Sequence, residues 1–214
     1  MLTVACVWVQ GHVPFSVEYV RRLHSMALRR IGRAFEFVCL TDRPKDVPKG
    51  VRPIQIKLPP YCKGWWAKIE LFKPGRFGGR VLYLDLDTLA VDSLDDIIDF
   101  PAEFALAPDG APNFKGGEGL KVVKRFNSSV MVWDWDATPD LYRNWTPAVA
   151  RRLWGDQDWI GEQCAFARTM PADWFPRLSA GRRNWPETSK VVLCKAPKNA
   201  EAALLWNWFD EMWR

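Results

Sequence analysis

The sequence contains few of the residues that build metal-stabilised or disulfide-linked domains. Only two histidines, His12 and His24, occur among 214 residues, so a structural zinc site is not expected. The five cysteines are an odd number, widely spaced and without a Cys-x-x-Cys pair. This is the pattern of reduced thiols rather than of a disulfide framework, and it favours a cytoplasmic location.

Long runs of one residue class are also absent. No apolar run approaches the roughly 20 residues of a membrane span, and the first residues lack the basic flank and apolar stretch of a signal peptide. The 30 basic and 25 acidic residues give a net charge of +5, which favours an anionic partner. Because no run of about five or six basic residues occurs, nucleic acid is not the expected partner.

The composition otherwise fits an ordinary globular protein. An apolar fraction of 48 % in a chain of this length predicts one domain over residues 1–214 with a sizeable core. Thirteen tryptophans are unusual, and we expect most of them in the core, with some available as flat platforms for sugars.

Strand and helix patterns alternate along the chain, which predicts an α/β domain with a mostly parallel sheet flanked by helices. Pro147 interrupts one helical pattern, and a segment rich in Gly, Pro and Asn at 109–119 is expected to be a mobile loop. The expected strands are 2–9, 35–40, 51–56, 80–84, 104–107, 129–133 and 191–193, and the expected helices are 17–31, 66–72, 140–153 and 200–213.

The strongest chemical signal is the segment 81–88, VLYLDLDT. Its apolar half reads as a strand buried on both faces, and ligands of open α/β sheets collect at the carboxyl ends of such strands. Asp85 and Asp87 follow directly, and two carboxylates this close gain most from a shared hard divalent cation. The alternative is a solvated acidic turn, and two further Asp-x-Asp motifs occur at 134–136 and 156–158.

Four segments read together resemble the GT-A-fold glycosyltransferases, closest to the retaining, metal-dependent enzymes related to glycogenin and bacterial galactosyltransferases. Their order and spacing carry the resemblance, which extends over the whole chain. The segments are 65–72 (WWAKIELF), 81–88 (VLYLDLDT), 126–133 (FNSSVMVW) and 155–158 (GDQD).

The resemblance implies a single-domain GT-A (Rossmann-like) hexosyltransferase. It would move a sugar from a nucleotide-sugar donor, with a UDP-sugar as the expected donor, to an acceptor hydroxyl with retention. Asp85 and Asp87 would hold Mn2+ or Mg2+, which neutralises the departing diphosphate. The acceptor, whether saccharide, lipid-linked or protein, is not identified, and its pocket is expected to involve 109–119 and 173–190.

The resemblance also assigns roles around the donor. Asp156 would orient sugar hydroxyls, and Gln157 would lie near the anomeric carbon. Each of these roles has an alternative. They are a surface lysine on an amphipathic helix for Lys68, a strand start with small polar residues for Asn127 and Ser128, the polar first turn of a helix for Asp156 and Gln157, and an exposed basic loop for Lys198. The residues implied to contact the donor are Val7, Trp8, Lys68, Leu86, Asn127, Ser128 and Lys198.

One departure concerns the third metal ligand. The family carries a histidine after the last strand, and Cys194 occupies that position here. A thiolate is a soft ligand, poorly suited to Mg2+ or Mn2+. The metal would then rest on two aspartates, water and diphosphate, or the chain would be a catalytically inactive nucleotide-sugar or carbohydrate-binding relative.

Two further alternatives remain open. Haloacid dehalogenase-like phosphatases also place an Asp-x-Asp after an apolar strand, but they carry Thr or Val where this chain has Leu89, and their motif opens the fold. The segment 204–214, rich in tryptophan and leucine, could make weak peripheral contact with a membrane. Packing of that segment against the domain is the favoured interpretation, because Asp210 and Glu211 would face anionic lipid.

Overall fold

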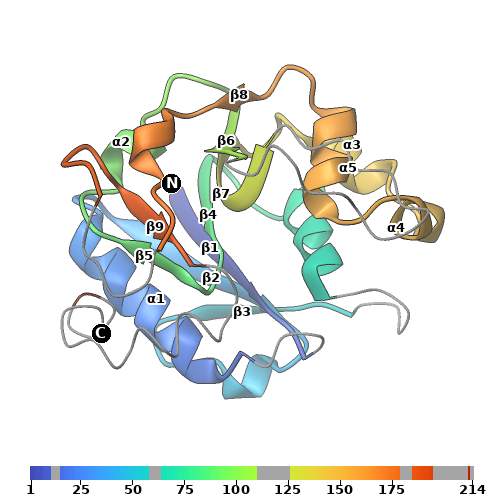
Figure 1. The fold of residues 1–214 in the computed structure, drawn as a ribbon. Helices are drawn as coiled ribbons and strands as arrows, with labels where there is room; N and C mark the ends of the chain where they lie inside the picture. The colour runs from blue at the N-terminus through green and yellow to red at the C-terminus, as the bar shows by residue number, and fades with distance from the viewer. Residues whose placement is uncertain (11–14, 58–63, 110–125, 179–184, 195–211, 213–214) are drawn as a thin grey trace.

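The computed structural model describes residues 1–10, 15–57, 64–109, 126–178, 185–194 and 212. Within them, seven strands form one sheet in the order β3-β2-β1-β4-β7-β6-β8 (Figure 1). The first four strands of the chain run parallel, and β7 is antiparallel to both of its neighbours. The strands are β1 (Leu2–Trp8), β2 (Phe35–Thr41), β3 (Arg52–Gln55), β4 (Arg80–Leu84), β6 (Phe104–Pro108), β7 (Phe126–Asp134) and β8 (Arg168–Thr169).

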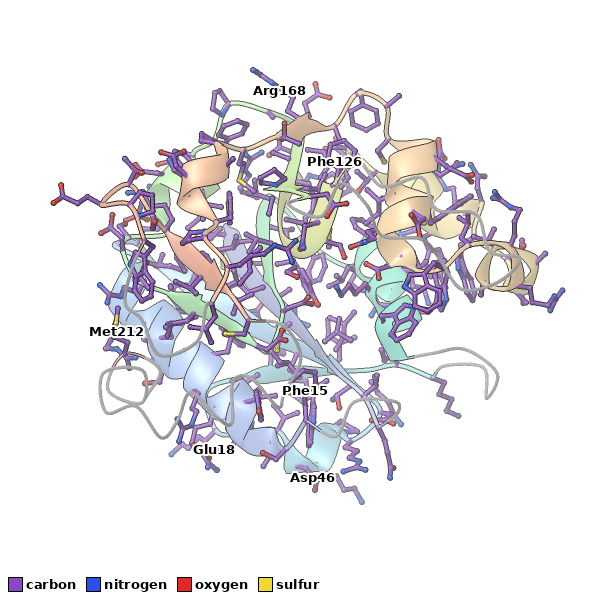
Figure 2. All side chains as sticks on the ribbon, viewed as in Figure 1. Phe15, Glu18, Asp46, Phe126, Arg168 and Met212 are labelled. Atoms are coloured by element: carbon purple, nitrogen blue, oxygen red, sulfur yellow. The ribbon has the colours of Figure 1, made fainter. Side chains whose placement is uncertain are left out.

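The strand that leads to the Asp-x-Asp motif is buried on both faces, as its apolar run predicts. Leu82 and Leu84 pack into the core on one side of the sheet, and Val81 and Tyr83 pack into the core on the other. Side chains fill the space on both sides of the sheet (Figure 2). β4 is therefore the central strand of a three-layer structure, and the Asp-x-Asp motif follows at its carboxyl end.

One face of the sheet is covered by α1 (Val17–Arg30), as expected. Val20, Leu23 and Ala27 are completely buried there, at the spacing of one helical face. The same layer contains α2 (Asp95–Ile98) and a two-stranded sheet of β5 (Thr88–Ala90) and β9 (Val191–Leu193). The strand pattern at 191–193 predicts β9, whereas β5 and α2, with three and four residues, are too short to give a periodic pattern.

The opposite face carries the helices that approach the candidate site. The segment expected as a helix at 66–72 is a 3-10 helix, η2 (Gly64–Phe72). The helix expected at 140–153 is two helices, α3 (Pro139–Arg143) and α4 (Pro147–Arg152), because proline is favoured in the first turn and breaks a helix interior. After them comes α5 (Asp156–Gln163), and short 3-10 turns η1 (Pro44–Asp46) and η3 (Ala172–Trp174) complete the elements.

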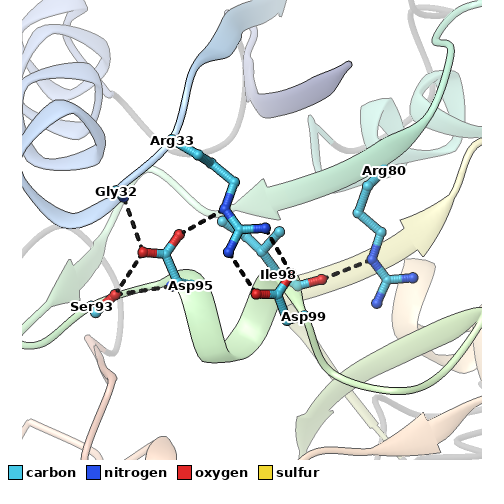
Figure 3. Close-up of polar contacts among 7 residues, drawn as sticks. All are labelled: Gly32, Arg33, Arg80, Ser93, Asp95, Ile98 and Asp99. Atoms are coloured by element: carbon cyan, nitrogen blue, oxygen red, sulfur yellow. Dashed lines mark hydrogen bonds and ion pairs between the residues drawn. The ribbon is translucent and has the colours of Figure 1, made fainter.

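The amino ends of the strands are joined by a structural ion network (Figure 3). The Arg33 guanidinium binds Asp95 at 3.1 Å and Asp99 at 2.5 Å. Arg80 donates to the carbonyls of Ile98, Phe100 and Ala102 at 2.7 to 2.9 Å, which satisfies groups left free after α2. These partners are backbone carbonyls and ion pairs, so the network stabilises the fold at the edge opposite the Asp-x-Asp motif.

Several sequence predictions fall outside the described residues. They are the loop beyond Asp109, the donor contact Lys198, and the terminal helix apart from Met212. Met212 packs against the core next to α1, and its carbonyl accepts a hydrogen bond from Arg29 at 3.0 Å. Among the helices that are described, none is long and apolar enough to cross a membrane.

Candidate functional site

The turn after β4 holds the first aspartate of the Asp-x-Asp motif in a fixed position. The backbone N–H of Asp85 donates to the carbonyl of Ser129 at 2.8 Å. The hydroxyl of Thr88 donates to the carbonyl of Asp85 at 2.7 Å. Because both backbone groups of Asp85 are bound, its carboxylate is presented toward η2.

A lysine from η2 joins this carboxylate to a second one. Nζ of Lys68 lies 2.9 Å from Oδ1 of Asp85 and 3.6 Å from Oδ2 of Asp156, the first residue of α5. It also donates to Oγ of Ser128, near the start of β7, at 3.1 Å. Four segments distant in sequence thus meet at one ammonium group. We call Lys68, Asp85, Ser128 and Asp156 the lysine–aspartate cluster.

Burial and charge act in opposite directions on the Lys68 ammonium. Its side chain is only 10 % exposed. Desolvation lowers the pKa of Lys68, but the carboxylates of Asp156 and Asp85 outweigh this effect and hold the pKa above its ordinary value. Lys68 therefore remains a cation at neutral pH, and the surface-lysine alternative is wrong.

One carboxylate oxygen of Asp156 lacks a hydrogen-bond donor among the described residues. Its Oδ2 is buried and accepts no hydrogen bond from the part of the chain that is described. Desolvation raises the pKa of Asp156. The charge of Lys68 and a hydrogen bond with Ser128 lower it, but the net shift of the pKa is upward. Buried polar atoms are nearly always paired, so this exception needs a partner such as water or a ligand hydroxyl. Gln157 follows on the first turn of α5 and is partly exposed.

The other residue of the predicted Asn-Ser pair has a different environment. Oδ1 of Asn127 accepts a hydrogen bond from the backbone N–H of Ser129 at 2.8 Å, so this oxygen shapes the start of β7. Ser128 is 3 % exposed and belongs to the cluster. The structure therefore brings Ser128, but not the Asn127 carbonyl oxygen, to the lysine.

β1 lies next to β4 in the sheet, and its last residues, Val7 and Trp8, extend beyond the pairing of Ala5 with Tyr83. The Trp8 ring is buried, its indole N–H donates to the carbonyl of Phe15 at 2.8 Å, and the Arg43 guanidinium lies 5.8 Å from the ring centre. Val7 is partly buried on the η2 side of the sheet. Trp8 is thus a packed residue, and Val7 is the one that faces the cluster side.

Asp87 and Cys194 lie opposite each other. The antiparallel register pairs Thr88 with Leu193, which places the preceding Asp87 across from the following Cys194. Burial, and then the charge of Asp87, raise the pKa of the Cys194 thiol well above its ordinary value. A cysteine sulfur is a soft donor and therefore a poor ligand for a hard cation.

The donor set nevertheless fits a hard divalent cation bound by two carboxylates. Asp85 and Asp87 supply oxygen ligands, which Mg2+ and Mn2+ prefer. Within the described ranges, no group of three or more His, Cys, Asp or Glu side chains could hold a metal. Leu86, between the two aspartates, is buried in the core on the α1 side, so only its backbone can reach a ligand.

Two features were not singled out as site residues from the sequence. The hydroxyl of Tyr83 donates to Oδ1 of Asp85 at 2.5 Å, and burial followed by the Asp85 charge raises the pKa of Tyr83. Trp65 and Trp154 stack with ring centres 6.4 Å apart, beside the helix start that carries Asp156. The period of two along β4 could have indicated Tyr83, because it shares a face with Asp85. The tryptophan pair depends on the tertiary fold.

Comparison with known proteins gives matches among solved structures. No protein-family model and no curated protein matches the sequence. One structure is the galactosyltransferase LgtC in complex with donor and acceptor sugar analogues, and another is a mutant of LgtC in which an active-site glutamine is replaced by glutamate. Each has a TM-score of 0.67 and 14 % identity, and covers 98 % of this chain and 94 % of LgtC. The chain therefore has an LgtC-like fold, which confirms the GT-A architecture expected from the sequence.

Proposed function

We propose that this protein is a glycosyltransferase that uses a nucleotide-sugar donor, with a UDP-sugar as the donor and a divalent cation as cofactor. The observation that supports it best is the lysine–aspartate cluster at the carboxyl end of β4. Ligands of open α/β sheets bind at the carboxyl edge of the sheet. The cluster combines the fixed Lys68 cation with two carboxylates, and Oδ2 of Asp156 accepts no hydrogen bond in the described residues. These are the groups needed to bind a diphosphate and a polyhydroxy sugar.

Asp85 and Asp87 would hold Mn2+ or Mg2+ through their carboxylate oxygens. When bound, the cation would offset negative charge on the nucleotide diphosphate as it leaves. Cys194 is a soft donor that suits this set poorly, so water and diphosphate oxygens would complete the coordination. We expect weaker cation binding than a site with a third protein ligand would have.

Lys68 and Asp156 would act on the donor itself. Lys68 stays charged because two carboxylates flank it, and it can attract an anionic donor group without any proton transfer. Oδ2 of Asp156 is buried and lies 3.6 Å from Nζ of Lys68, but it accepts no hydrogen bond within the described residues, so a sugar hydroxyl that enters the site would donate to it. Recovering such a bond contributes about 1–3 kcal/mol to donor binding.

Gln157 would lie near the reacting carbon, next to Asp156 on α5. One of the matched structures is a mutant in which an active-site glutamine of LgtC is replaced, and Gln157 is the glutamine that we propose for the corresponding role here. Retention of configuration is part of the proposal and would be read from the anomer of the product.

The direct test is release of UDP from a panel of UDP-sugars in the presence of Mn2+. We expect release by the wild-type protein and its loss in Asp156→Asn, while Asp136→Asn leaves it unchanged. Asp136 is the matched control because it belongs to another Asp-x-Asp motif but is exposed after β7. Equal release by Asp156→Asn would contradict the assigned role.

A second candidate function is donor binding without turnover. The observation that favours it is Cys194 at the position where the resembled family carries a histidine ligand. Both functions use the same pocket, so binding alone does not separate them. Tight, metal-dependent UDP binding together with no UDP release and no transferred sugar would establish the binding-only relative.

A further inference from the structure

The 3-10 helix η2 separates two environments. Residues three apart lie on one face of such a helix. Trp65 and Lys68 share the face that meets Trp154 and the lysine–aspartate cluster. Trp66 and Ile69 share another face, and they line a separate cavity between η2 and α3. This cavity has a volume of about 570 Å3, which is large enough for a small ligand.

Aromatic rings form much of this cavity. Trp66 is 2 % exposed, so only its edge is accessible, and its ring centre lies 6.1 Å from that of Trp145. Tyr142 and Trp145 are partly exposed. Nε1 of Trp145 is buried and has no hydrogen-bond partner in the described residues. The cavity therefore offers the partly exposed rings of Tyr142 and Trp145 as its apolar surface.

The rim of the cavity carries an excess of positive charge. Lys57, Lys73 and Arg143 line it, and all three are exposed. The one carboxylate in the lining, Glu70, is bound to Arg76 at 2.6 Å, so it does not offset these cations. Nζ of Lys73 lies 5.7 Å from the Tyr142 ring, which places a cation directly at an aromatic face.

The ion pair that involves Arg143 is weak. Its guanidinium lies 3.7 Å from Asp140, and both side chains are more than half exposed. Exposed pairs of this kind contribute little, so Arg143 can exchange this partner for a ligand anion. The positive charge of Arg143 is thus available to bind an anionic ligand.

We propose that this cavity binds an anionic saccharide. The partly exposed rings of Tyr142 and Trp145 would pack against the apolar side of a sugar ring, and the three cations would bind carboxylate, sulfate or phosphate groups along the saccharide. A purely apolar ligand would leave the cations unused. The inference goes beyond the proposed transfer reaction, because the cavity lies on another face of η2 and its binding can be measured without turnover.

The test is calorimetric titration of the full chain with oligogalacturonate at low salt, compared with the fully methyl-esterified form of the same oligosaccharide. We expect the acidic form to bind and the neutral ester to bind at least about tenfold more weakly. Added salt should reduce the affinity for the acidic form, because screening weakens exposed charge pairs. An excess of UDP should not displace it.

Two double variants complete the experiment. Lys73→Ala with Arg143→Ala should weaken binding by about tenfold or more, since it removes two cations at the rim. Lys45→Ala with Lys49→Ala removes the same charge from exposed lysines outside the cavity, and it should leave binding unchanged. Circular dichroism checks that both remain folded.

Four outcomes would overturn the proposal. They are no binding of oligogalacturonate, equal binding of the neutral ester, equal loss in both double variants, and displacement by UDP. Displacement by UDP would place the saccharide at the donor site instead. Failure of UDP-sugar turnover with intact oligogalacturonate binding would contradict only the proposed function.

Discussion

Replacing Lys68 with methionine removes the ammonium group that lies between Asp85 and Asp156. The three side chains are between 6 % and 21 % exposed, so the variant leaves two carboxylates buried close together. Removing one partner of a buried ion pair costs about 3–5 kcal/mol. We expect the lower end, about 3 kcal/mol, because Asp85 keeps the hydrogen bond from Tyr83. For a chain of this size that loss corresponds to a fall in Tm of about 6–12 °C.

The loss of unfolding free energy in Lys68→Met should be larger at high pH than at low pH. Burial already raises the pKa of Asp156 in the folded protein, and loss of the neighbouring cation raises it further. A carboxyl whose folded pKa exceeds its unfolded pKa destabilises the fold above the folded pKa, and this penalty disappears as the pH falls through that value. The free energy of unfolding, measured in urea, should therefore differ more from wild type at about pH 8 than at about pH 5.

Two variants control this experiment. Lys68→Met combined with Asp156→Asn removes the unpaired charge and should recover part of the lost stability. Lys190→Met removes a lysine that also lies between two carboxylates, Asp92 and Asp96, but these are at least half exposed, so it should cost only about 1 kcal/mol. An equal loss in both lysine variants, or a loss that does not change with pH, would refute the account of the cluster.

Three further predictions concern single side chains. Tyr83→Phe removes the hydrogen bond to Asp85 and should lower the free energy of unfolding by about 1.5–3 kcal/mol; unchanged stability in urea would contradict this bond. Cys194→His places an imidazole opposite Asp87 and should tighten Mn2+ binding by about tenfold or more in calorimetry with UDP present; equal affinity would show that position 194 does not face the cation. Trp133→Ala empties a site that is 1 % exposed and should cost about 3–5 kcal/mol of stability in urea, with a loss under about 1 kcal/mol counting against the packing described.

The sheet could be predicted because its strands are buried on both faces. Leu82 and Leu84 on one side and Val81 and Tyr83 on the other form a continuous apolar run, and such runs are visible in the sequence. The 3-10 form of η2 could not be predicted, since its apolar spacing does not distinguish it from an α-helix. The short strand β5 could not be predicted because it forms its hydrogen bonds with β9, which follows about a hundred residues later in the sequence.

The candidate site was predicted in part. The residues Asp85, Ser128 and Asp156 stand in segments that resemble a known family, and the structure brings them together. The sequence did not indicate that Lys68 would be buried between two carboxylates, because that pairing depends on how η2 and α5 pack on the sheet. The cavity on the other face of η2 was missed for the same reason, since its aromatic and basic residues come from η2, α3 and the connecting segments beside them.

The most direct measurement is calorimetric titration of UDP into the protein, first with Mn2+ and then with EDTA, for the wild type, Asp87→Ala and Asp136→Ala. Asp87 lies beside the cluster, whereas Asp136 is exposed after β7 in another Asp-x-Asp motif. The account predicts that UDP binds wild type and Asp136→Ala only when Mn2+ is present, and that Asp87→Ala does not bind it. Absence of binding under either condition, or equal binding by Asp87→Ala, would contradict a metal-dependent donor site at the end of β4.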